Sequence, residues 1–190
     1  MNTKKSINSK GEYGIGFEMG GSEIRNVGTL LDSRRAQVAS MASNSFGVSE
    51  HRMELVKNIR GIDFVNDAAS VNVNGIYMAL DNLQKKAVWI TSFEQWGEAG
   101  DLFADLMQLI TSKISSVVFL GNGSSPSRTI IEGMGVPTDC ANDMETAVRV
   151  AFYSAGANQE VLYCPGVPAD TNGESIAQRG TSFKSALAQL

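Results

Sequence analysis

The stretch GIDFVNDAASVNVNGIYMAL, residues 61–80, decides the fold of this chain. Its apolar run, residues 62–65, ends in Asn66 and Asp67, and three small residues follow before apolar residues recur at helical spacing. This order predicts a strand, a tight turn and a helix, which is the place where α/β proteins bind their ligands. Asp67 carries the only charge of the turn, so the sequence predicts a binding turn that is nearly empty of reactive groups.

Outward from this stretch, short apolar runs alternate with segments of helical periodicity. The two runs on either side of Arg60 and Gly61 predict a β-hairpin. The alternation that follows predicts a Rossmann-like, doubly wound α/β fold, in which helices cover both faces of a mostly parallel sheet. The expected strands are residues 53–59, 62–66, 86–91, 115–121, 137–140 and 160–166, and the expected helices are residues 33–46, 72–83, 100–113, 127–133, 142–155 and 173–189.

The sequence divides into an arm and one domain. Residues 1–30 are polar and rich in glycine, and we expect a flexible or irregular arm there. Residues 31–190 are expected to form a single α/β domain, with the small-residue helix at 33–46 as its N-terminal extension. No apolar core follows the first lysines, so the N-terminus does not predict a signal peptide.

The composition argues against several classes of protein. The formal net charge is −4 and the basic residues are scattered, so we expect no binding of nucleic acid. No run approaches the ~20 apolar residues of a membrane span. Cys140 and Cys164 predict reduced thiols, and hence a cytoplasmic protein. His51 is the one histidine, which argues against a metal site and a catalytic triad, and we assign no catalytic residue.

Other strand ends lie on the same expected ligand-binding edge. The loop GNGSS, residues 121–125, lacks the third glycine of a dinucleotide fingerprint and the lysine of a phosphate loop. We interpret it as a plain strand-to-helix turn. Trp96, in the loop after residues 86–91, either offers an aromatic face to a ligand or packs over the sheet.

Asp67 and Arg52 are the charged side chains that we expect nearest the turn. Asp67 has two interpretations: it caps the helix that follows, or it accepts hydrogen bonds from a ribose diol. Arg52 precedes the first strand of the predicted hairpin, which returns it to the neighbourhood of Asp67. The planar cation of an arginine suits a phosphate, a ribose or an adenine face.

At HRMELV…GIDFVNDAASVN the sequence resembles the start of the C-terminal domain of the Mur ligases, and within that family the enzymes that add D-glutamate to the peptidoglycan precursor. The family has HR.E followed, at the same spacing, by NDSKATN. The terminal QRGTSF matches the family's RG..F, so the resemblance covers residues 47–190. The helix at 33–46 is similar to the one that closes the family's central domain.

The departures from the family pattern explain the nearly empty turn. The family's serine, lysine and threonine after Asn-Asp are replaced by small or apolar residues, and so are two positions near the C-terminus. The resemblance implies that these positions hold the incoming amino acid, so its binding groups are lost. The replaced positions are Ala68, Ala69, Val71, Ala169 and Ile176. The positions that match the family face the nucleotide, which implies a residual ATP or ADP site formed by Arg52, Asp67, Asn66 and Asn72.

A complete Mur ligase also has a UDP-sugar domain and a central ATPase domain with a phosphate loop, and neither fits in the ~50 residues before His51. The leading hypothesis is therefore a non-catalytic relative of the C-terminal domain, a pseudoenzyme that acts as a binding or structural module linked to peptidoglycan synthesis. A second hypothesis is one chain of a split ATP-dependent D-glutamate ligase. A third is a structural protein that self-assembles. The first and third hypotheses both predict a protein partner or a second copy of this chain.

Overall fold

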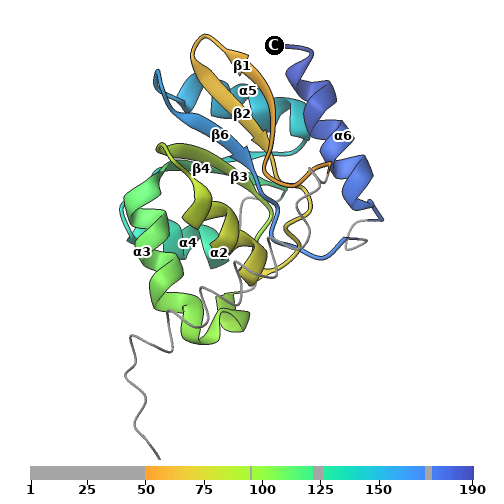
Figure 1. Cartoon of the computed structure of the whole chain (residues 1–190). Helices are drawn as coiled ribbons and strands as arrows, with labels where there is room; N and C mark the ends of the chain where they lie inside the picture. Colours follow the sequence, from red (N-terminus) through yellow and green to blue (C-terminus); the bar gives the residue numbers. More distant parts are fainter. Residues whose placement is uncertain (1–49, 95, 122–125, 170–172) are drawn as a thin grey trace, which may run out of the picture. The chain divides into compact units, whose positions relative to one another are not determined.

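The computed structural model describes residues 50–94, 96–121, 126–169 and 173–190 (Figure 1). The expected arm at 1–30, the expected helix at 33–46 and most of the GNGSS loop lie outside the described residues. The described residues form a six-stranded sheet in the order β1-β2-β6-β3-β4-β5. The strands are β1 (Glu54–Ile59), β2 (Ile62–Asn66), β3 (Ala87–Thr91), β4 (Ile114–Leu120), β5 (Thr138–Ala141) and β6 (Glu160–Tyr163).

The expected hairpin is confirmed. β1 runs antiparallel to β2, and the pair Ile59↔Ile62 closes around a two-residue turn. Arg60 and Gly61 have φ of +53° and +82°, the left-handed geometry that matches the twist of the flanking strands. At the other end of the hairpin Glu54 pairs with Asn66. The residues before β1 therefore lie beside the carboxyl end of β2.

Helices cover both faces of the sheet, which confirms the doubly wound α/β prediction (Figure 1). Along β3, the side chains of Ala87 and Trp89 join the core under one set of helices, and those of Val88 and Ile90 join the opposite core. The period of two in a strand produces this alternation. The first core contains α2 (Val73–Asn82), α3 (Phe103–Lys113) and α4 (Pro126–Gly133), and the second contains α5 (Met144–Ser154) and α6 (Ile176–Leu187).

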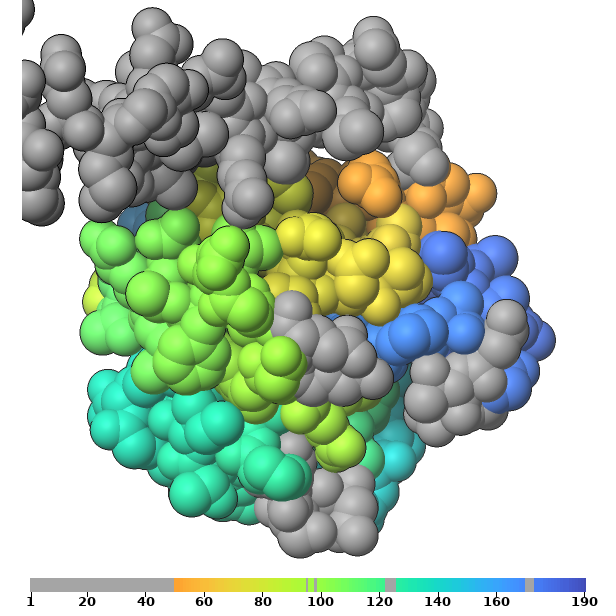
Figure 2. Space-filling view, turned by 90° about the horizontal axis from the view of Figure 1, so that it is seen from below, coloured from red at the N-terminus to blue at the C-terminus, as the bar shows by residue number. Residues whose placement is uncertain are grey.

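The last strand lies in the middle of the sheet. β6 pairs in parallel with β2 through Asn66↔Tyr163 and with β3 through Ile90↔Tyr163. The carboxyl ends of β2, β6 and β3 thus meet at one edge, where ligands bind in doubly wound folds. In Figure 2 the orange, yellow and blue parts of the surface, from residues near 50, near 70 and from the C-terminal part, adjoin on the displayed face.

Two helix starts differ from the prediction by three residues. The last helix begins at Ile176 rather than at 173, because Ser175 and Gln178 form a capping box with hydrogen bonds of 3.2 and 2.7 Å. The helix predicted from residue 100 begins with a 3₁₀ turn, Gly100–Leu102, before α3. None of the helices in the described part of the chain has the length and apolar character needed to cross a membrane.

Candidate functional site

Asp67 lies at the centre of the ligand-binding edge. Its backbone N–H donates to the carbonyl oxygen of Tyr163 at 2.8 Å, which extends the pairing of β2 with β6 by one residue. Its Oδ1 accepts a hydrogen bond from the backbone N–H of Met53 at 3.0 Å, and its Oδ2 accepts one from the Ser70 hydroxyl. The residue is only 2% exposed. The carboxyl group therefore joins the turn after β2 to the segment before β1.

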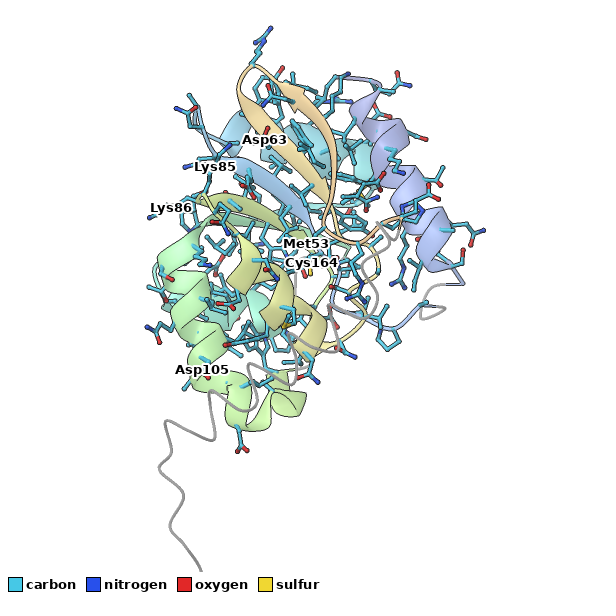
Figure 3. The ribbon with its side chains drawn as sticks, viewed as in Figure 1. Met53, Asp63, Lys85, Lys86, Asp105 and Cys164 are labelled. Carbon is cyan, nitrogen blue, oxygen red and sulfur yellow. The ribbon has the colours of Figure 1, made fainter. Side chains whose placement is uncertain are left out.

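Burial raises the pKa of the Asp67 carboxyl above its ordinary value. The hydrogen bonds from Ser70 and Met53 and the charge of Arg52 act in the opposite direction without cancelling that effect. Burial also raises the pKa of the neighbouring Cys164 thiol well above its ordinary value, and Asp67 adds to this rise. Figure 3 labels Met53 and Cys164 close together at this edge. A carboxyl group with a raised pKa at a strand end is typical of a ligand site.

Arg52 is exposed at the same edge and stands between two residues in left-handed conformation, His51 at φ +68° and Met53 at φ +43°. Backbone hydrogen bonds fix this turn on both sides. The N–H of His51 donates to Glu54 Oε2 at 3.1 Å, and the His51 carbonyl oxygen accepts from the Ala69 N–H at 3.0 Å. The expectation that the hairpin brings Arg52 beside the turn after β2 is confirmed.

Asn66 faces inward rather than toward the surface. Its Nδ2 donates to Nδ1 of His51 at 2.9 Å and to Glu54 Oε2 at 3.3 Å, and its Oδ1 accepts from the Ala68 N–H at 3.3 Å. Asn66 is fully buried. In this structure Asn66 supports the turn that carries Arg52.

Asn72, and not Asp67, caps the helix. Its side chain accepts the N–H of Gly75 at 3.0 Å from the extended backbone conformation of an N-cap. The alternative that Asp67 caps α2 is therefore wrong, because the intervening turn places Asp67 too early and both of its oxygens accept other donors. Asn72 is exposed at the rim of the site.

The five replaced positions carry no charge and no strong hydrogen-bonding group. Ala68 is fully buried and belongs to the core under α5 and α6. The other four side chains are half-buried: Ala69, Val71, Ala169 and Ile176. The three replaced positions directly after Asp67 therefore offer no side-chain partner to a charged ligand group.

Several residues of the site were missed by the sequence analysis. Lys184 of α6 donates to Glu54 Oε1 at 2.8 Å and to Glu50 Oε1 at 3.1 Å. Arg179, five residues earlier in α6, is 3% exposed and donates to the carbonyl oxygens of Val167 at 3.0 Å and Pro168 at 2.7 Å. The glutamate of HRME and the arginine of QRG were the available signals.

The aromatic loop after β3 packs inward. Trp96 is 8% exposed and meets Phe93 and Phe103 edge to face, with ring centroids 5.1 and 5.9 Å apart. The packing interpretation of Trp96 is the one that the structure supports. Among the described residues, no three His, Cys, Asp or Glu side chains gather in a group that could hold a metal ion.

A model of the Mur ligase glutamate ligase domain matches residues 51–166, which is more than half of the chain. This chain belongs to the Mur ligase family. The match begins at His51 and runs through β6, so it includes Arg52, Asn66, Asp67 and Asn72. The predicted resemblance to the C-terminal domain of this family is confirmed.

Relatives within the family are bacterial enzymes. The chain is 31% identical over 150 residues to the UDP-N-acetylmuramoylalanine–D-glutamate ligase of Bacteroides thetaiotaomicron, a match that covers 78% of this chain and 33% of that enzyme. It is 30% identical over 164 residues to the enzyme of the same name from Pelodictyon phaeoclathratiforme, covering 86% of this chain and 34% of that enzyme. The chain thus spans about a third of the length of these relatives.

A solved Mur ligase structure is similar as well. The UDP-N-acetylmuramate-alanine ligase of Thermotoga maritima shares 15% sequence identity with this chain, with a TM-score of 0.47. That match covers 87% of this chain and 39% of the solved one.

Proposed function

We propose that this Mur ligase domain binds an adenine nucleotide at the edge formed by β2 and β6, and that it serves peptidoglycan precursor synthesis as a binding module without forming an amide bond itself. The observation that carries the proposal is the exposed Arg52, which is held beside the buried carboxyl group of Asp67 by hydrogen bonds on both sides of its turn.

The chemistry of Arg52 supports the nucleotide. Within the described part of the chain its guanidinium has no hydrogen-bonded partner, and such a group can pair with a phosphate in two parallel hydrogen bonds or stack on an adenine face. Asp67 supports the site from beneath, because its two oxygens accept hydrogen bonds from Met53 and Ser70 and so hold the turn that carries Arg52. Asn66 and Asn72 complete the proposed site, the first by supporting the turn and the second at its rim.

The replaced positions support the non-catalytic part of the proposal. An incoming amino acid carries carboxylates, which need donors or cations in the site. Ala68 and Ala69 follow Asp67 directly, and the first of them is committed to the core. The positions after Asp67 therefore offer no donor or cation to the carboxylates of an incoming amino acid.

A second candidate is one part of a split ligase. The observation that favours it is the 30 to 31% identity to D-glutamate ligases over 150 residues or more, which includes the proposed nucleotide site. In this case the chain supplies the C-terminal third and another polypeptide supplies the rest. Both candidates place the protein in the cytoplasm and require a protein partner or a second copy of this chain.

Calorimetric titration of the full chain with ADP and with Mg-ATP tests the nucleotide. We expect binding that Arg52→Ala weakens by about tenfold or more, since a charge-assisted contact of this kind contributes ~1.5–3 kcal/mol. Arg149→Ala is the matched control, because Arg149 is an exposed arginine on α5 that pairs with Glu145 at 2.5 Å. No heat at millimolar nucleotide would contradict the proposal.

A ligation assay separates the two candidates. The chain is incubated with UDP-N-acetylmuramoyl-L-alanine, D-glutamate and Mg-ATP, alone and with the remaining domains of a relative. We expect no product in either case. Product with the chain alone would refute the non-catalytic proposal, and product only in the mixture would favour the split ligase. Light scattering of the full chain tests self-association.

A further inference from the structure

The ring of His51 rests directly on the backbone of α6, at a place where that helix has no side chain. A Cβ atom added to Gly180 would lie 2.1 Å from Nδ1 of His51 and 2.4 Å from its Cγ, far inside van der Waals contact. Gly180 is helical and has no positive φ, so its backbone conformation does not require glycine. The close approach of the ring is the feature that requires it.

A buried amide fixes the orientation of this ring. Asn66 Nδ2 can only donate, so Nδ1 of His51 is the acceptor at 2.9 Å in this hydrogen bond, which corresponds to the tautomer with a proton on Nε2. The Asn66 Oδ1 is itself oriented by the Ala68 N–H. His51 is 5% exposed, so its ring is enclosed between the end of β2 and α6.

A salt-bridge pair clamps the same segment to the same helix. Glu50 and Glu54 flank the turn, and Lys184, one turn after Gly180, binds both of them at 3.1 and 2.8 Å. α6 therefore holds the segment at residues 50–54 through two independent contacts. Its Arg179 holds the loop after β6 through Val167 and Pro168.

We infer that His51 is a positioning residue: seated on Gly180 and oriented by Asn66, it lets α6 fix the left-handed turn that presents Arg52. The inference rests on the proposed function for the identity of the ligand, and on the contacts alone for the placement of the turn. A histidine that merely filled the core would not need the left-handed backbone at φ +68°, nor the hydrogen bonds that tie its carbonyl and amide to the site.

Three variants of the full chain test the contact: Gly180→Ala, His51→Ala and the double variant. Two amides report on the turn without any nucleotide, namely Met53 N–H, which donates to Asp67, and Ala69 N–H, which donates to His51. Hydrogen exchange at both is measured by NMR, with the amide of Val118 in β4 as the internal reference. ADP titration of each variant is the second readout.

Gly180→Ala is expected to speed exchange at Met53 and Ala69 by about tenfold or more relative to Val118, although alanine favours the helix. The double variant should be no worse than His51→Ala, because the clash disappears with the ring. ADP affinity should follow the same order. Unchanged exchange in Gly180→Ala, or full additivity in the double variant, would overturn the inference.

The two proposals fail in different ways. If the wild-type chain does not bind ADP, the proposed function fails, while exchange at Met53 and Ala69 still decides whether α6 fixes the turn. If Gly180→Ala does not fold, His51→Ala decides alone, since it removes the ring without creating a clash. In that case, the inference is overturned if the Met53 and Ala69 amides of His51→Ala exchange at the wild-type rate.

Discussion

The two ends of β2 each carry an aspartate, and the two carboxyl groups have opposite environments. Asp63, near the start of the strand, accepts from Lys85 Nζ at 2.5 Å and from Asn58 Nδ2 at 2.6 Å (Figure 3). These hydrogen bonds, that of Lys85 first, lower the pKa of Asp63. Asp67, just beyond the other end, is buried and has no ion-pair partner at hydrogen-bonding distance among the described residues, and burial raises its pKa.

The difference separates a structural carboxyl group from a functional one. A carboxylate at the surface needs only a lysine and an amide, and its pair contributes little to folding. A carboxyl group that is buried with hydrogen bonds alone is costly, and proteins keep such groups where a ligand or a strained turn uses them. Under the proposed function, the carboxyl end of β2 is the end that serves the ligand, and the predictions below test the contrast between the ends.

The largest contrast is expected between two glycines. Gly166, at the functional edge, has φ +68°, and an added Cβ would lie 2.2 Å from Cδ1 of the buried Ile76. Gly61, in the hairpin turn at the opposite edge, has φ +82° and no atom within 4 Å of an added Cβ. Gly61→Ala should lower the free energy of unfolding by about 1–2 kcal/mol, from backbone strain alone.

Gly166→Ala should lower the free energy of unfolding by about 2–5 kcal/mol, because overpacking against Ile76 adds to the same backbone strain. Urea denaturation of both variants gives the comparison. A smaller loss in Gly166→Ala than in Gly61→Ala would mean that the edge can adapt. The double variant Gly166→Ala/Ile76→Val should recover part of the loss if the clash causes it.

The two aspartates should give opposite pH profiles. A carboxyl group with a raised pKa in the folded state favours folding below its unfolded pKa and loses that contribution as the pH rises through the folded pKa. Asp67→Asn should therefore gain stability relative to wild type as the pH rises from about 4 to about 7. It should also weaken ADP binding.

Asp63→Asn is the matched control with the reverse sign. The pKa of the Asp63 carboxyl group is lowered in the folded state. Its contribution to stability is therefore present above the unfolded pKa and is lost as the pH falls through the folded pKa. The variant should be less stable than wild type near neutral pH and should converge with it in acid. Urea midpoints across the pH range measure both profiles, and parallel profiles would remove the distinction between the ends of β2.

The smallest contrast concerns two lysines. Lys85 pairs with Asp63 away from the site, whereas Lys184 pairs with Glu50 and Glu54 beside Arg52. Lys85→Met and Lys184→Met should both shift the urea midpoint only slightly, because these ion pairs are exposed to solvent. Only Lys184→Met should lower ADP affinity, by about two- to fivefold. Equal ADP affinities in the two variants would mean that Lys184 forms surface ion pairs but does not contribute to nucleotide binding.

Much of this structure could be predicted from local pattern. The alternation of apolar runs and helical periodicity located the strands and helices, and the Arg60-Gly61 signal located the hairpin that carries Arg52 back to Asp67. The turn sets the register of the hairpin near Arg60, so this adjacency was predictable to within one residue. The register shift between Leu55 and Lys57, which gives the pair Glu54↔Asn66, was not.

The remaining features depend on contacts that are distant in sequence. Lys184 and Glu50 are 134 residues apart, and nothing in the local pattern of either predicts their pairing. Asp67 and Asn72 are both good N-cap residues, and the length of the turn between them decided which one caps α2. The enclosure of Asn66 beside His51 required the position of α6, which the order of the predicted elements does not supply.

The place of β6 in the sheet also governs how the chain acquires its fold. β1 and β2 have no sheet hydrogen bonds with β3, β4 or β5, because β6 separates the two groups. The β1-β2 hairpin and the unit of β3, β4 and β5 can therefore join into one sheet only after residues 160–163 have been synthesised. β6 then forms parallel pairs with strands that are distant in sequence. Such pairing is intrinsically slow, so the arrival of this last strand is expected to limit the rate of folding.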